Sequence, residues 1–131
     1  DGDEPEHCLE GTKGPVILDE VLPAEKLGEY QYLVPKRRYS AFVNTDIMTL
    51  LNSFKADTLI LTGAATNVCV HYTGADAHQY DFKIKVVVEA TAGTSKESHE
   101  AALNALNYLQ HGAKVPIELV LEAMKDFKFP H

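Results

Sequence analysis

The fold of this 131-residue chain is decided by one stretch, Leu61-Thr-Gly-Ala-Ala-Thr-Asn-Val-Cys-Val-His-Tyr-Thr73. An apolar run of strand length, residues 58–61, leads into it, and a helical pattern continues after it. We therefore predict a strand that ends at 62–63, a turn of small residues, and a helix that begins near Cys69. Backbone N–H groups at a helix start favour an anion, so a thiolate at Cys69 would be stabilised there. A small buried cysteine that only fills the core is an equally good interpretation of its position.

Strand and helix patterns alternate around this stretch. Before it, we predict a loop at 1–15 and a strand at 31–34. Between them lies a short irregular or helical segment that Pro23 closes, with the apolar residues Val16, Ile17, Val21 and Leu22. A helix capped by Asn44 or Thr45 follows the strand, with Ile47, Leu50, Leu51 and Phe54 inward. From there on, we predict a strand at 58–62, a helix at 67–79 and a strand at 83–88. The next helix is opened by the capping box 94–97 and ends at Gly112, and its inward residues are Ala102, Leu103, Leu106 and Leu109. A strand at 114–117 and a helix at 117–127 follow, the helix with Val120, Leu121, Met124 and Phe127 in period.

This alternation is typical of right-handed βαβ crossovers on a parallel sheet, and the run at 83–88 is apolar enough for burial on both faces. Ligands of such sheets bind beyond the carboxyl ends of the strands. Lys36 follows the predicted strand at 31–34, and Cys69 follows the strand at 58–62. We therefore expect the two side chains to meet at one edge, where an ammonium group can stabilise a thiolate or a developing oxyanion.

Composition and charge restrict the classes of function. A hydrophobic content of 45% and a charged content of 24% describe a globular domain, and a net charge of −7 argues against a nucleic acid partner. No apolar stretch approaches the ~20 residues of a membrane span, and no signal peptide is recognisable. Cys8 and Cys69 form neither a CxxC pair nor a disulfide framework. We expect a cytoplasmic protein with reduced thiols.

Three motifs resemble those of the isochorismatase-like cysteine hydrolases, the family of the nicotinamidases and N-carbamoylsarcosine amidases. Lys36-Arg-Arg-Tyr-Ser-Ala-Phe42 looks like the lysine motif of that family, and Gly63-Ala-Ala-Thr-Asn-Val-Cys-Val70 looks like its nucleophile motif. His7-Cys-Leu-Glu-Gly-Thr12 is similar to a segment of many members. The motifs come in the family's order and spacing and cover nearly the whole chain.

The resemblance implies a three-layer α/β/α Rossmann-like fold with a parallel sheet in the order 3-2-1-4-5-6. It also implies an Asp–Lys–Cys triad that hydrolyses amide-type C–N bonds through a thioester. Carried onto this chain, Cys69 is the nucleophile and Lys36 is the lysine of the triad. The N–H groups of Ala65, which follows an expected cis peptide after Ala64, and of Cys69 would form the oxyanion hole. Tyr39 matches an aromatic residue that walls the substrate pocket.

The triad aspartate of the family has no counterpart in this chain. It belongs to an Asp-x-x-x-Asp-Phe type motif after the first strand, whereas Asp1 and Asp3 lie in a loop just before the His7 motif. We therefore expect that residues 1–131 form one domain that corresponds to the C-terminal two-thirds of a family member. The first two strands of the sheet would lie upstream of this chain, together with the aspartate.

Three classes of function follow from the resemblance. The first is a cysteine amidohydrolase that cleaves the C–N bond of a small carboxamide or N-carbamoyl compound through a thioester on Cys69. The second is an isochorismatase-type hydrolase, although relatives of that kind typically lack the nucleophilic cysteine. The third is a non-catalytic family member that serves in binding or assembly. In each case the resemblance implies a homo-oligomer, a dimer or a tetramer.

No cofactor is required by this scheme, but His7 matches a metal-ligating histidine of nicotinamidases. Zinc or another divalent metal would then be bound, with an Asp-x-His pair and a further histidine supplied from upstream of this chain. One histidine does not make a metal site, and Glu4-Pro5-Glu6 replaces the Trp-Pro-Pro that nicotinamidases tend to carry. A loop histidine with a local hydrogen bond is the alternative for His7.

Other polar and aromatic side chains are predicted to be structural. His71 lies roughly 200° around a helix from Cys69 and cannot easily act as its base. His78, His99 and His111 are expected on solvated helix faces. Tyr32, Phe54 and Tyr108 are expected in the core rather than at a cofactor.

Overall fold

The computed structural model describes residues 2–18, 20–21 and 30–126 of the chain. It divides into two compact units, residues 1–33 and 34–131. Each unit is described by itself. Leu22, Pro23 and Phe127, which the sequence analysis placed in predicted helical segments, lie outside the described residues, as does Asp1.

The first unit consists of bends and turns in its described part. The Thr12 hydroxyl donates to the Leu9 carbonyl at 2.6 Å and accepts from the Gly14 N–H at 3.2 Å, which closes a tight loop. This agrees with the loop predicted at 1–15. The strand predicted at 31–34 was wrong, because the structure assigns no strand there. A run of β-formers becomes a strand only by joining a ladder, and the ladder in the described residues is built from other segments.

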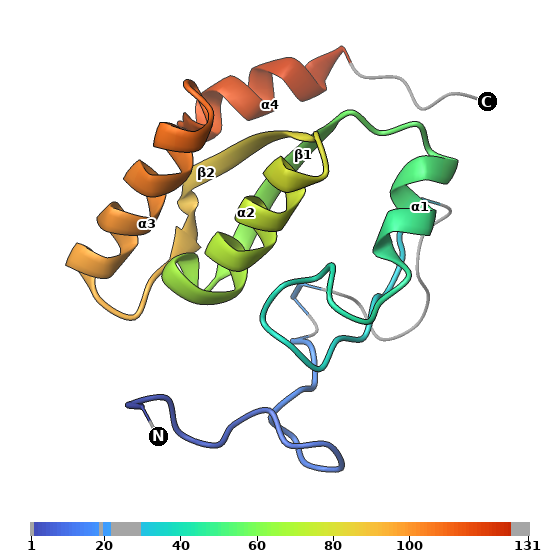
Figure 1. The fold of residues 1–131 in the computed structure, drawn as a ribbon, viewed down its shortest axis with the longest axis vertical. Coiled ribbons are helices and arrows are strands. Elements are labelled where there is room, and N and C mark those ends of the chain that lie inside the picture. Colours follow the sequence, from blue (N-terminus) through green and yellow to red (C-terminus); the bar gives the residue numbers. More distant parts are fainter. Residues whose placement is uncertain (1, 19, 22–29, 127–131) are drawn as a thin grey trace. The chain divides into compact units, whose positions relative to one another are not determined.

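The second unit contains a parallel α/β arrangement, as the alternation of patterns predicted (Figure 1). Its sheet has the order β1-β2-β3, and both neighbouring pairs are parallel. The elements are α1 (Ile47–Ser53), β1 (Thr58–Ala64), the π-helical turn η1 (Thr66–Val70), α2 (His71–Gln79), β2 (Lys83–Ala92), α3 (Lys96–Leu109), β3 (Lys114–Val115) and α4 (Ile117–Lys125).

Strand β2 is the centre of this unit. Val86 and Val87 are both fully buried, and successive side chains of a strand point to opposite faces, so both faces of β2 are covered. One face carries the main core, in which Ile84 and Val86 pack with Leu103 and Leu106 of α3. The burial predicted for the run at 83–88 is therefore confirmed.

Helix α2 packs closely against this core because of Gly74. A Cβ at this position would lie 3.0 Å from a methyl carbon of Leu106 and 3.2 Å from one of Leu61. A side chain here would require the ends of Leu106 and Leu61 to shift, so glycine permits the close packing of α2 against α3 and β1. This close approach fixes the helix that follows the Cys69 turn.

The ends of several elements differ from the prediction. The N-cap position of α1 is Asp46, whose side chain makes no capping bond. The hydroxyl of Thr45, one of the two predicted caps, accepts from the Ile47 N–H at 3.3 Å. Phe54 follows the helix with 48% of its surface exposed. Helix α3 is capped by Ser95, whose hydroxyl accepts from the Ser98 N–H at 3.1 Å, in place of the predicted box at 94–97.

Some side chains predicted to point inward are exposed. Leu109 is the last residue of α3 and is 40% exposed, and Leu121 and Met124 lie on the exposed surface of α4. Spacing alone does not tell how much of a helix its neighbours cover. None of the helices in the described part of the chain has the length and apolar character of a membrane-crossing helix.

Candidate active site

The turn that carries Cys69 begins directly where β1 ends. The Ala64–Ala65 peptide is cis, as expected, and η1 follows it. The Ala65 carbonyl accepts from the N–H of Val68 at 3.0 Å and from that of Val70 at 3.2 Å. The second bond spans five residues, which is the spacing of a π-helix. The single helix predicted at 67–79 is therefore a π-turn followed by α2, and Cys69 lies in the wider turn.

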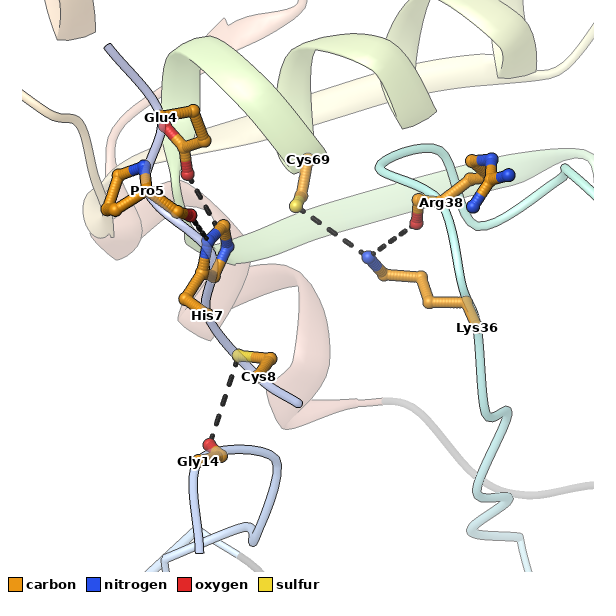
Figure 2. Close-up of polar contacts among 8 residues, drawn as sticks. All are labelled: Glu4, Pro5, His7, Cys8, Gly14, Lys36, Arg38 and Cys69. Carbon is orange, nitrogen blue, oxygen red and sulfur yellow. Dashed lines mark hydrogen bonds and ion pairs between the residues drawn. The ribbon is translucent and has the colours of Figure 1, made fainter. Parts of the chain in front are cut away.

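Lys36 and Cys69 come together in the second unit, although 33 residues separate them (Figure 2). The Lys36 Nζ lies 3.6 Å from the Cys69 Sγ and donates to the Arg38 carbonyl at 2.9 Å. Lys36 is exposed and Cys69 is half-buried, so the pair is accessible from solvent. The expected meeting of an ammonium group and a thiol is confirmed as geometry. It does not depend on a strand at 31–34.

The loop that carries Lys36 is attached to α2 by contacts on either side of Ser40. The Ala41 N–H donates to the Thr73 hydroxyl at 3.0 Å. The ring of Tyr39 stacks on that of Tyr72, with centroids 5.8 Å apart. These contacts place the lysine loop against the same helix that continues from the Cys69 turn. Tyr39 follows Lys36 by three residues and Tyr72 follows Cys69 by three residues, so their stacked rings form an aromatic surface between the two segments that carry Lys36 and Cys69.

His7 belongs to the first unit and makes local contacts. Its Nδ1 lies 2.7 Å from the Pro5 carbonyl, and its Nε2 lies 3.4 Å from a carboxylate oxygen of Glu4 (Figure 2). Nearby, the Cys8 Sγ donates to the Gly14 carbonyl at 3.9 Å. The described residues contain no group of three or more His, Cys, Asp or Glu that could hold a metal ion. One imidazole and one carboxylate are too few for a metal centre, so these residues alone do not fit a bound metal.

Comparison with known proteins places this geometry in a family. The Isochorismatase domain model matches residues 2–116, which is most of the chain. The chain belongs to the isochorismatase family. The solved structure of an isochorismatase-like hydrolase from Alkaliphilus metalliredigens superposes with a TM-score of 0.80 and 33% sequence identity, covering 92% of this chain and 63% of that one.

Two curated relatives differ in what their names say about activity. The maleamate amidohydrolase of Pseudomonas putida is 31% identical, over 76% of this chain and 53% of that protein. A protein of Arabidopsis thaliana named as a probable inactive nicotinamidase is also 31% identical, over 82% of this chain and 53% of that protein. The chain thus spans little more than half the length of these relatives. The family therefore includes amidohydrolases, and it also includes a member that its name describes as inactive.

The surroundings of two histidines of this isochorismatase-family chain were missed by the sequence analysis. His99 is only partly exposed rather than on a solvated face, and its Nδ1 lies 2.7 Å from the hydroxyl of buried Thr66. His78 is also partly buried and contacts the Gln110 amide at 2.9 Å, whereas His111 is exposed as expected. The helical spacing of the apolar residues identified the polar face of α3 correctly. However, the neighbouring turn η1 covers the first residues of that face. No signal in a single sequence reports that cover.

Aromatic residues were also misplaced by the sequence analysis. Tyr32, Phe54 and Tyr108 were expected in the core but are exposed, Tyr108 to 83%. No role was predicted for Tyr72, because it lies outside the nucleophile motif at 63–70. The aromatic neighbour of Tyr39 is nevertheless Tyr72, which also stacks near His71 with centroids 6.2 Å apart.

Proposed function

We propose that this chain is the part of a cysteine amidohydrolase that carries the nucleophile. The observation that carries the proposal is the contact of 3.6 Å between the Lys36 ammonium group and the Cys69 sulfur. A positive charge at this distance stabilises a thiolate, which is the nucleophilic form of cysteine. Membership of a family that includes a maleamate amidohydrolase supports the choice of an amide-type substrate.

The proposed reaction is the hydrolysis of a C–N bond in a small carboxamide or N-carbamoyl compound. The Cys69 thiolate attacks the carbonyl carbon, and the N–H groups of Ala65 and Cys69 stabilise the oxyanion. The C–N bond breaks as the amine takes up the proton that the base removed from the thiol. A water molecule then cleaves the Cys69 thioester, which releases the acid and restores the thiol. Lys36 stabilises the thiolate and the negative charge that develops on the substrate, and Tyr39 contacts the substrate. The base that takes the thiol proton is assigned to no residue of this chain.

The test is the release of ammonia or amine from primary carboxamides and N-carbamoyl amino acids by the purified protein. A Cys69→Ala variant removes the nucleophile, so we expect the release to fall to the rate without enzyme. Cys8→Ser is the matched control, because Cys8 is the other free cysteine and lies in the first unit. This control should keep the parent rate. Release that continues undiminished in Cys69→Ala would contradict the proposal.

A non-catalytic role is the second candidate, and it is favoured by the similarity to the Arabidopsis protein named as a probable inactive nicotinamidase. A binding protein built on this site would retain affinity for an amide without releasing amine. Binding can be followed by calorimetry with the same compounds. Saturable binding with no release, in the parent protein and in Cys69→Ala alike, would favour this candidate over the amidohydrolase.

A further inference from the structure

The start of η1 is attached to α3 through a buried hydroxyl. Thr66 is the first residue of η1 and is fully buried, and its Oγ1 lies 2.7 Å from the Nδ1 of His99 in the first turn of α3. A buried hydroxyl needs a partner, and in the described structure His99 supplies one. The imidazole is itself only partly exposed, so the bond is shielded from competing water.

Two further bonds join the same turn to the loop before α3. The Asn67 amide donates to the Thr94 hydroxyl at 2.9 Å, and its oxygen accepts from the Thr94 N–H at 3.0 Å. This loop approaches α3 closely at Gly93, where a Cβ would lie 2.7 Å from the His99 Cβ and 2.9 Å from its Cα. Gly93 therefore lets the loop pass directly over His99. The contacts of Thr66 and Asn67 together form a connection that we call the η1–α3 clamp.

The η1–α3 clamp acts on the part of the backbone that the proposed reaction uses. Thr66 immediately follows Ala65, and Cys69 is three residues further along the same π-turn. The proposed oxyanion donors are the N–H groups of these two residues, so their separation is set by the conformation of η1. Oxyanion donors act only when they are held in place before the reaction, and residues behind them must fix them.

We propose that His99 is a positioning residue that holds the oxyanion donors of η1 in place through its hydrogen bond with Thr66. This inference rests on the proposed function. His99 does not contact the substrate and acts through Thr66. Removal of its ring nitrogen should loosen η1 and slow the chemical step, while substrate binding, which uses Tyr39 and the aromatic surface, should change little.

The test compares His99→Leu, which lacks the nitrogen, with His99→Asn, whose amide can reach the place of Nδ1. We expect His99→Leu to lower kcat about 10- to 100-fold with a nearly unchanged KM, because small misplacements of catalytic groups have effects of this size. His99→Asn should recover most of the loss. Thr66→Val removes the other partner, so it should match His99→Leu, and the double variant should be no slower than either. The exposed His111→Leu is the control and should behave as the parent protein.

A second readout does not require turnover. Amide hydrogen exchange of the peptide that covers residues 63–70 should lose protection in His99→Leu and regain it in His99→Asn, with His111→Leu unchanged. Unchanged protection in His99→Leu, or lost protection with an unchanged kcat, would overturn the inference. If the parent protein released no amine while its exchange responded as expected, the proposed function would fail and the attachment of η1 would stand.

Discussion

At the scale of single residues, the ammonium group of Lys36 is the feature on which the chemistry of Cys69 depends. Its Nζ lies 3.6 Å from the sulfur, and the Arg38 carbonyl orients it from the other side at 2.9 Å. A point charge on a flexible stem can follow the sulfur as charge moves onto the substrate. The charge of Lys36, more than its hydrogen bond, should therefore set the reactivity of Cys69.

A Lys36→Met variant tests this, since it keeps the length of the side chain and removes the charge. We expect alkylation of Cys69 by iodoacetamide, measured in a Cys8→Ser background, to slow clearly because less thiolate is stabilised. Amide turnover should fall by about 10²-fold, the size typical for loss of an electrostatic contact at the reacting atoms. The exposed Lys96→Met is the matched control. Equal alkylation rates in Lys36→Met and the parent protein would contradict the role of Lys36.

The sequence predicts Lys36 and Cys69 because both lie in recognisable motifs. Cys69 also follows a strand, β1, whereas the strand predicted before Lys36 is absent from the described residues. It misses Tyr72 and His99, although each contacts a residue of the site. Their partners are distant in sequence, and a single sequence carries no signal for a contact between two helices or between a loop and a helix. The direct neighbours of the reacting atoms were thus predictable, and the residues behind them were not.

At the scale of elements, the lysine loop depends on α2 for its position. The Ala41 N–H and the Tyr39 ring both contact the first residues of α2, at Thr73 and Tyr72. Thr73→Val removes the acceptor and keeps the shape of the side chain. The loop should then open more often, because its free energy of local unfolding decreases.

Limited proteolysis measures this opening, since Lys36, Arg37 and Arg38 are trypsin sites within the loop. We expect Thr73→Val and Tyr72→Ala to be cleaved faster there than the parent protein, with a matching decrease in amide turnover. Thr49→Val changes an exposed threonine of α1 in the same way and should leave cleavage unchanged. Cleavage at the parent rate in both α2 variants would show that these contacts do not hold the loop.

The element boundaries show what periodicity can and cannot predict. The apolar spacing located the α-helices and strands in the described part of the second unit, but it merged η1 with α2. The cap of α3 is Ser95 rather than the box at 94–97. We expect Ser95→Ala to lower the free energy of unfolding by about 1 kcal/mol, the usual effect of losing an N-cap. Ser53→Ala, at the exposed end of α1, should stay within about 0.5 kcal/mol of the parent. Urea unfolding of both variants measures the difference.

At the scale of the whole molecule, the described core of the second unit lies where α3 covers β2. Leu106 is 0% exposed, and its side chain packs against α2 at Gly74, where the absence of a Cβ leaves room for it. Leu106→Ala should lower the free energy of unfolding by about 2–5 kcal/mol, because it creates a cavity that α2 cannot fill without moving. Leu119→Ala, at a position 56% exposed on α4, should have a much smaller effect in the same urea experiment. Similar losses for both would contradict this location of the core.

The central claim is that Cys69 forms a thioester with an amide-type substrate. Its most direct test is mass spectrometry of the protein after acid quenching during turnover of a reactive carboxamide or N-carbamoyl compound. We expect an adduct with the mass of the acyl group on the peptide that contains Cys69, absent from Cys69→Ala and present in Cys8→Ser. Amine release that proceeds without any adduct on Cys69, and at the same rate in Cys69→Ala, would contradict the claim.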